Sequence, residues 1–203
     1  MQPHAAIPSP EQCRGYYDEF AMFDNIRDHS ILVARVAAVL CEGLGERGSC
    51  ATPLPNRELT VAGALLHDIA KSMCIEKGCH HAEVGRDICI DLGYPEVSEI
   101  VAEHVVLRNF RTEAYRRGFF RPKELVYYAD KRVRHDRIVP LTGRLAYILE
   151  RYGNNDPHKE KLIRHNFQLT LDFETFLFAH LSFLPHQLDS RATTPIFADE
   201  LAR

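Results

Sequence analysis

The sequence has no apolar run long enough to cross a lipid bilayer, so it predicts a protein without a transmembrane helix. Its first ten residues, MQPHAAIPSP, lack the charged stretch followed by an apolar stretch that a secretion signal needs. Internal repeats and low-complexity segments are also missing. These absences argue against membrane-bound, exported and repeat proteins. We therefore expect a cytoplasmic protein with no membrane partner.

A strong excess of either charge is missing as well. The formal net charge is -3, from 25 Lys and Arg against 28 Asp and Glu. Such a balance disfavours non-specific binding to nucleic acids, so we expect no stable nucleic-acid partner, although a local basic pocket remains compatible with it. With 203 residues, 45% of them hydrophobic, the chain fits one globular domain with a substantial core.

No Cys-x-x-Cys motif occurs among the six cysteines. An even number of cysteines fits a disulfide framework, but a chain of this length can form a core without one. We therefore expect reduced thiols. Cys74 and Cys79 precede His80 and His81, and this spacing differs from a typical short zinc knuckle. A structural zinc site there is the less favoured interpretation.

Alternating strand patterns of useful length are absent, and apolar residues recur at three- and four-residue spacing along most of the chain. The pattern predicts an all-α fold, a single-domain helical bundle. Capping residues, prolines and glycines place the helices at about 24–44, 56–71, 80–93, from 95, 122–134, 140–153 and from 156 onward.

The same pattern predicts the domain organisation. We expect a flexible lead over 1–10, a helical domain over 11–188 and a polar tail over 189–203, with C-terminal helices at about 139–184. Residues 50–55 and 107–121 are predicted loops, and the second is expected to lie over a pocket.

Five of the predicted helices carry a histidine or an aspartate within or beside an apolar face. A buried polar group without a partner costs roughly 1–3 kcal/mol, and an isolated carboxylate costs more. Several such groups are compatible with a stable domain only if they satisfy one another or share a ligand. A divalent cation meets this need, because imidazole and carboxylate are its usual ligands. The residues concerned are His29, His67, Asp68, His81, His104 and Asp130.

Each of these residues alone is weak evidence, because a single histidine on an apolar face is more often an ordinary core residue. The chain even contains a second His-Asp pair, His135–Asp136, among basic residues, where it predicts a solvated helix end. The pair His67–Asp68 differs because Leu65, Leu66, Ile69 and Ala70 flank it. The inference therefore depends on the joint arrangement.

The order of these residues resembles the HD-domain phosphohydrolase superfamily, and the HDIG-type subgroup in particular. The resemblance extends over about residues 24–135. Ala70 stands where the family often has glycine, and we expect this small residue to preserve the site. The matching segments are His29, LLHDIAK at 65–71, HHAEVG at 80–85, EH at 103–104 and YYAD at 127–130.

The resemblance implies an HD-type bundle whose metal ligands are His29, His67, Asp68 and Asp130. It further implies a second ion held by His81 and His104, with Asp68 as the bridge. His80 is the rival of His81, but His81 has the family's spacing to Gly85 and lies in the inward stripe. Mixed nitrogen and oxygen ligands favour Fe or Mn, with Co, Ni and Zn also compatible.

The activity implied is hydrolysis of a phosphoester or phosphoanhydride by metal-activated water. Asp68 and Lys71 are the expected catalytic residues, and Lys71 and Arg108 the expected phosphate contacts. Further basic residues, at 111, 131, 132 and 134, stay open, as does a role for Glu83 or Glu103 in orienting a histidine.

The substrate is expected to be a nucleotide or another small phosphorylated molecule. Aromatic residues of the 107–121 loop either stack on a base or, as we favour, pack on the core. Two alternatives remain at this level. One is a di-iron oxygenase with the HD fold, and the other is a non-catalytic metal-binding regulatory module. The oligomeric state is not predicted.

Overall fold

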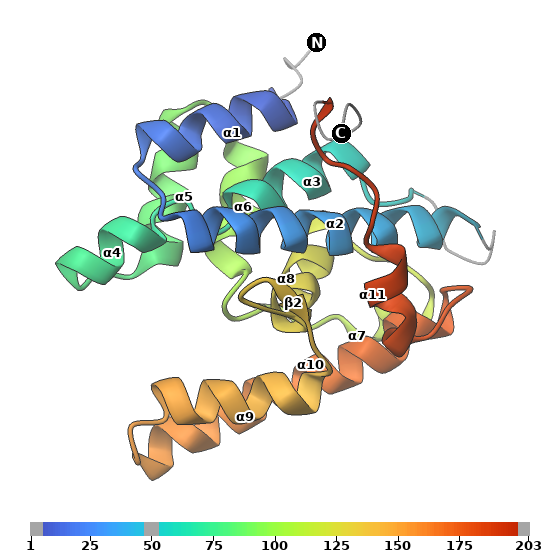
Figure 1. The fold of residues 1–203 in the computed structure, drawn as a ribbon. Helices are drawn as coiled ribbons and strands as arrows, with labels where there is room; N and C mark the ends of the chain where they lie inside the picture. Colours follow the sequence, from blue (N-terminus) through green and yellow to red (C-terminus); the bar gives the residue numbers. More distant parts are fainter. Residues whose placement is uncertain (1–5, 47–52, 199–203) are drawn as a thin grey trace.

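The computed structural model describes residues 6–46 and 53–198, and it confirms the predicted all-α fold (Figure 1). Two-residue strands β1 (Val133–Arg134) and β2 (Arg137–Ile138) form one antiparallel hairpin, with Val133 opposite Ile138. The helices are α1 (Pro10–Glu19), α2 (Asp24–Glu46), α3 (Arg57–Leu66), α4 (Lys71–Lys77), α5 (His81–Asp91), α6 (Pro95–Glu103), α7 (Thr112–Arg116), α8 (Pro122–Arg132), α9 (Leu141–Tyr152), α10 (Pro157–Ala179), the 3-10 helix η1 (Pro185–Gln187) and α11 (Leu188–Arg191).

Local capping explains where several helices begin. The Asn56 carboxamide oxygen accepts a hydrogen bond from the Leu59 amide at 2.9 Å, as the sequence predicted. Asp156 caps α10 in the same way, and Pro157 occupies its first turn. Helix α1 begins with a capping box between Ser9 and Gln12, so the last residues of the predicted flexible lead belong to the folded part.

Helix α2 runs through the middle of the molecule, and α3 and α8 pack against it (Figure 1). Helix α6 packs on α3, α5 and α8. The contact between α5 and α6 is close because Gly85 has no side chain: a Cβ there would lie 2.8 Å from a Val101 methyl group. The helices that carry the candidate ligands are thus packed into one body.

Helices α9 and α10 form a hairpin that lies at the other side of α8 from α2 (Figure 1). Tyr127 on α8 hydrogen-bonds Thr170 on α10 at 2.6 Å between their hydroxyl oxygens. Arg132 is 4% exposed and donates to the carbonyl oxygens of Val139 and Pro185, and to the Glu174 carboxylate at 3.1 Å. The C-terminal part is therefore fixed to α8 by buried polar contacts.

Two predicted helices end earlier than expected. Helix α3 stops at Leu66, so His67 and Asp68 lie in the turn before α4 instead of on a helix reaching Lys71. The His67 ring nitrogen Nδ1 contacts the Ala64 carbonyl oxygen at 2.7 Å, and in a continuing helix that oxygen would bond the Asp68 amide. Ala70 has φ -93°, which an alanine adopts without strain.

Helix α8 ends at Arg132, not near residue 134, and the β-hairpin follows. The second His-Asp pair lies in its turn, where His135 has φ 55°. Both residues are exposed, but the prediction of a helix end at this place was wrong.

The C-terminal segment is only partly what we predicted. Ala192 and Phe197 are buried and α11 includes residues 189–191, so part of the predicted polar tail packs on the body. Residues 1–5 of the predicted lead, residues 50–52 of the predicted 50–55 loop, and residues 199–203 lie outside the described residues.

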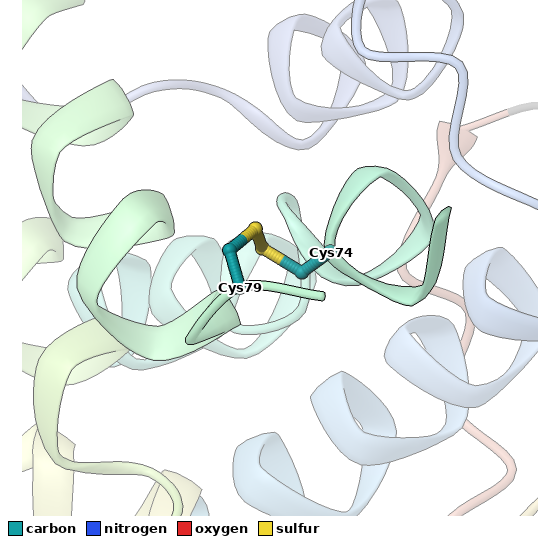
Figure 2. Close-up of a disulfide and its surroundings, with 2 residues drawn as sticks. All are labelled: Cys74 and Cys79. Atoms are coloured by element: carbon teal, nitrogen blue, oxygen red, sulfur yellow. A yellow bond between two sulfur atoms is a disulfide. The ribbon is translucent and has the colours of Figure 1, made fainter. Parts of the chain in front are cut away.

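A disulfide joins Cys74 in the middle of α4 to Cys79, just before α5 (Figure 2). This corrects the expectation that all thiols are reduced, and it leaves no thiolate there for a structural zinc. Cys13, Cys41 and Cys89 are free and buried, as expected for core residues. Sequence spacing did not reveal the disulfide, because it arises where the α4–α5 turn brings the two Cα atoms to 4.6 Å.

None of the helices in the described part of the chain combines the length and apolar character that a bilayer span requires.

Candidate metal centre

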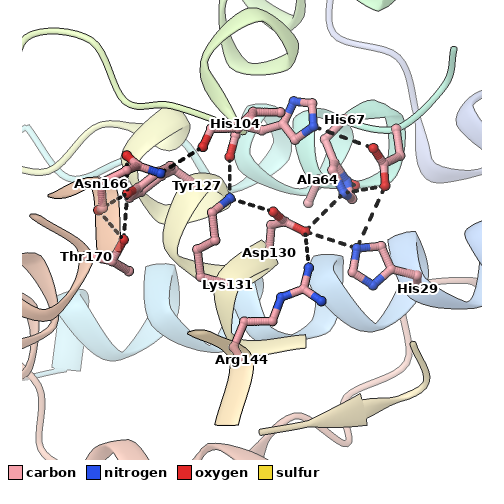
Figure 3. A network of polar contacts seen from close by, with 12 residues as sticks. His29, Ala64, His67, His104, Tyr127, Asp130, Lys131, Arg144, Asn166 and Thr170 are labelled. Atoms are coloured by element: carbon pink, nitrogen blue, oxygen red, sulfur yellow. Dashed lines mark hydrogen bonds and ion pairs between the residues drawn. The ribbon is translucent and has the colours of Figure 1, made fainter. Parts of the chain in front are cut away.

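All six predicted ligands converge on one place between the helices. His29 comes from α2, the pair His67–Asp68 from the turn after α3, His81 from α5, His104 from the residue after α6, and Asp130 from α8. Figure 3 shows His29, His67, His104 and Asp130 pointing toward a common region from separate elements. Apart from His81, each is at most 6% exposed.

One oxygen of the Asp68 carboxylate faces His29 and His67. Oδ2 lies 3.3 Å from Nε2 of His67 and 3.8 Å from Nε2 of His29. Asp130 completes this side, because its Oδ1 lies 3.1 Å from Nε2 of His29 and 3.8 Å from Nε2 of His67. The ligand atoms of His29, His67 and Asp68 all lie within 4.8 Å of one another, which is compatible with one ion.

The other Asp68 oxygen faces a second pair of histidines. Oδ1 lies 3.3 Å from Nε2 of His81 and 3.5 Å from Nε2 of His104. These two ring nitrogens lie 3.1 Å apart. His80, the rival of His81, is exposed and begins α5 as its N-cap. Asp68 therefore belongs to two groups of possible ligands, one through each carboxylate oxygen.

Backbone carbonyls orient the two most deeply buried imidazoles. Nδ1 of His67 lies 2.7 Å from the Ala64 oxygen, and Nδ1 of His104 lies 2.7 Å from the Val101 oxygen. A carbonyl only accepts, so Nδ1 of each ring carries a proton, and in the neutral form of the ring the Nε2 lone pair points to the centre. Neither glutamate has the orienting role considered from the sequence: Glu83 is exposed, and Glu103 pairs with Lys123 at 2.8 Å.

Two buried atoms of the centre make no hydrogen bond within the described residues: Nε2 of His67 and Oδ1 of Asp68. Buried nitrogen and oxygen atoms normally have partners, and leaving one without a partner costs roughly 1–3 kcal/mol. Both atoms point into the ligand groups described above. Divalent cations would satisfy them, so the donor set fits one or two such ions.

Cationic side chains surround the two carboxylates. Lys71 donates to Asp68 at 2.6 Å, Lys131 donates to Asp130 at 2.7 Å, and Arg144 lies 3.8 Å from Asp130. Burial opposes the ionisation of Asp68, but the charges of Lys71 and His67 outweigh it and hold the pKa of this carboxyl well below its usual range. Burial also opposes the ionisation of Asp130, but the charge of Lys131 holds the pKa of this carboxyl well below its usual range. Both acidic ligands are thus ionised at neutral pH.

The histidines respond differently to burial. Burial lowers the pKa of His81 from 6.5 to about 4, although Asp68 opposes the shift. It also lowers the pKa of His29 and of His104 below 6.5. For His67 the effect of burial is overcome by the Asp68 charge, and the pKa is raised. Three of the four imidazoles are therefore neutral at pH 7, the state that binds metal.

The two predicted phosphate contacts lie in different places. Lys71 lies in the centre, whereas Arg108 is exposed and is not among the residues that line the adjoining pocket. Arg111 pairs with the buried Glu124, which also accepts from Tyr115. Residues 112–116 form α7, and Tyr115 and Phe120 are buried, so these aromatic residues pack on the core as we favoured.

Sequence reasoning missed the importance of two cations, Lys131 and Arg144. Lys131 was one of several basic residues after Asp130, and only the fold shows that its amino group turns back to Asp130 and the His104 carbonyl (Figure 3). Arg144 lies on α9, outside the recognised motifs, and carried no signal in the sequence.

Comparisons with known proteins agree with this geometry. A family model described as HD domain matches residues 26–135, more than half of the chain. An uncharacterized protein of Methanocaldococcus jannaschii is 27% identical over 153 residues, which cover 70% of this chain and 86% of the relative. No solved structure gives a significant match. All six ligand candidates lie within the matched range.

Proposed function

The chain belongs to the HD-domain family, whose members are generally metal-dependent hydrolases, and from this premise we propose that it is a phosphohydrolase. The proposed reaction is hydrolysis of a phosphoester or phosphoanhydride in a nucleotide or another small phosphorylated molecule. One observation carries the proposal: Asp68 offers one oxygen to His29 and His67 and the other to His81 and His104, beside a cluster of cations.

We propose that two transition-metal ions, with Fe or Mn favoured over Co, Ni and Zn, occupy the two ligand groups. Bound there, such ions supply Lewis acidity and lower the pKa of water. Asp68 would hold both ions, His29, His67 and Asp130 one of them, and His81 and His104 the other. Carbonyl oxygens of Ala64 and Val101 keep two of the imidazoles in the tautomer that binds.

The cations account for substrate binding in this proposal. Lys71, Lys131 and Arg144 all line the pocket next to the centre, so a phosphate entering it meets three positive side chains. Electrostatic stabilisation of the charge on the transferring phosphoryl group is strong where water is excluded. An oxygenase acting on an uncharged polyol has no need of such a cluster, so the cluster favours hydrolysis over that form of the di-iron alternative.

The test compares the two His-Asp pairs of the chain. Asp68→Asn should abolish metal-dependent release of phosphate from p-nitrophenyl phosphate or nucleotides, because a ligand to both ions is lost. Asp136→Asn changes the exposed pair, whose aspartate side chain is 74% exposed, and should behave as wild type. Retained activity in Asp68→Asn would contradict the proposal, whereas dioxygen uptake without phosphate release would favour the oxygenase.

A further inference from the structure

A pocket of about 550 Å³ adjoins the metal centre, a volume typical of small-molecule sites. Its inner end is lined by His81, His104 and Asp130, and its walls come from α4, the segment after α6, α9 and α10. If the proposed function holds, a phosphate at the ions places the rest of the substrate in this pocket. The chemistry of the walls therefore bears on what the leaving group is.

The inner end carries the groups that fit a phosphate. Lys71, Lys131 and Arg144 line it together. Nε of Arg144 is buried and makes no hydrogen bond within the described part of the chain. A guanidinium donor without a partner, in the same pocket as two ammonium groups, suits a doubly charged phosphate, because hydrogen bonds between ions are stronger than those between neutral groups.

The outer walls are mainly apolar, and several of their apolar side chains are more than half exposed. Ile75 is 62% exposed, Val106 is 52% exposed and Leu162 is 56% exposed. Exposed apolar side chains gathered around one pocket are typical of a ligand site, because water is a poor environment for them. The apolar wall residues are Ile75, Val105, Val106, Ile148, Leu162, Ile163 and Phe167.

Polar side chains that could bind a sugar are few in these walls: Arg151, the Tyr152 hydroxyl and Asn166. Asn166 is already engaged, since its Oδ1 accepts from Tyr127 and its Nδ2 donates to the Val105 carbonyl oxygen. Asp130 is bound by His29 and Lys131. A site that binds sugar hydroxyls needs polar partners for them, because a hydroxyl buried without one lowers affinity.

We propose that the substrate is a phosphate monoester whose leaving group is a hydrocarbon, and that the apolar walls bind this group. Water adds to phosphorus as the phosphorus–oxygen bond to the leaving group breaks. The products are inorganic phosphate and an alcohol, whose oxygen takes up a proton from the attacking water. This proposal deepens the proposed function and rests on it.

The experiment uses alkyl phosphates, whose leaving alcohols differ little in intrinsic reactivity. With metal-loaded protein, the kcat/KM for phosphate release is measured for butyl, pentyl and hexyl phosphate, for glycerol 3-phosphate and for AMP. Each added methylene should raise kcat/KM by about fourfold if it is buried on binding. The kcat/KM for hexyl phosphate should therefore exceed the values for both glycerol 3-phosphate and AMP.

Two leucines of equal exposure provide the matched variants. Leu162 lines the pocket and Leu184 does not, and both are 56% exposed, so an aspartate at either position should not prevent folding. Leu162→Asp should lower the ratio of kcat/KM for hexyl phosphate to that for glycerol 3-phosphate at least about tenfold. Leu184→Asp should leave this ratio unchanged.

The outcomes separate the two proposals. An increase with chain length that Leu162→Asp alone removes supports the hydrocarbon leaving group. Equal rates along the alkyl series, or a preference for glycerol 3-phosphate or AMP, overturn it while the phosphohydrolase proposal stands. Failure to release phosphate from every compound of this series, with metal present, overturns the hydrocarbon proposal. Failure also with p-nitrophenyl phosphate and a nucleoside triphosphate overturns the phosphohydrolase proposal with it.

Discussion

Asp68 has the central position among the residues of the site, because its two oxygens face different histidine pairs. The other ligands lie on one side of Asp68 or on the other. A single substitution of one of them should therefore affect the metal ion on its own side only. His81 differs from the others in being partly exposed, with 28% of its side chain accessible. It is therefore the ligand that can be changed with least disturbance of the core.

His81→Ala is predicted to remove one of two ions from each chain and to leave the other. The reason is that His29, His67 and Asp130 lie on the opposite side of Asp68. Metal content of the purified protein, measured by elemental analysis, gives the answer. The neighbouring variant His80→Ala should keep both ions, because that side chain is exposed. An unchanged metal content in His81→Ala would show that His81 is no ligand.

The metal-free protein is predicted to lose stability as the pH falls from 6.5 toward 4. In the unfolded chain His81 takes up a proton near pH 6.5, whereas in the folded chain its pKa is about 4. Between these values the unfolded state binds more protons, so the free energy of unfolding decreases as the pH is lowered. His29 and His104 act in the same direction.

Urea unfolding of chelator-treated protein at pH 7 and pH 5 measures this effect. His81→Gln should lose less free energy of unfolding over that range than wild type, because one depressed histidine is gone. Equal losses in the two proteins would mean that His81 does not titrate as its surroundings indicate.

At the scale of elements, the junction of α8 with the C-terminal part depends on one buried guanidinium. Arg132 donates to the Tyr128 hydroxyl at 2.6 Å as well as to Glu174 and two backbone carbonyls. Tyr128 and Glu174 also hydrogen-bond each other. Removing the arginine leaves a carboxylate and two carbonyls without their partner.

Arg132→Leu is predicted to lower the free energy of unfolding by about 3 kcal/mol, the lower end of the cost of breaking a buried ion pair from one side, because the Glu174 side chain is 22% exposed. Arg137→Leu, five residues away with 84% of the side chain exposed, should have little effect. Equilibrium denaturation with urea compares the two. A loss in Arg132→Leu no larger than in the control would show that the network adds nothing to stability.

Elements whose ends are set by local chemistry could be predicted from the sequence. Asn56 and Asp156 mark helix starts through contacts within one turn, and Pro157 follows the second of them. The end of α3 could not be predicted, because the His67 ring is held in place by the rest of the centre. Helix α4 and the β-hairpin were missed because they are too short for a periodic pattern.

At the scale of the whole molecule, the candidate ligands could be named in advance because each interrupts an apolar face. Their order along the chain gave the resemblance, and the fold brings the side chains together. The substrate pocket could not be predicted from the sequence. Its walls come from α4, α9 and α10. Residues such as Arg144 and Leu162 lie there far from the ligands in sequence and share no motif with them.

The site also ties together elements that are far apart in sequence. Ligands come from α2, α5 and α8 and from the ends of α3 and α6, so a bound ion contacts most of the motif-bearing core. Such a site exists only in the folded chain, and ion binding should therefore be coupled to folding. The two cysteines of the disulfide, Cys74 and Cys79, line the pocket. The disulfide therefore joins α4 to the start of α5 at the pocket wall.

The metal content of the Asp68→Asn variant tests the central claim most directly. Elemental analysis of wild-type protein should find two transition-metal ions per chain, and Asp136→Asn should retain both. Asp68→Asn should contain none, because neither ligand group is complete without that carboxylate. Two ions retained in Asp68→Asn, with the variant folded, would contradict the account.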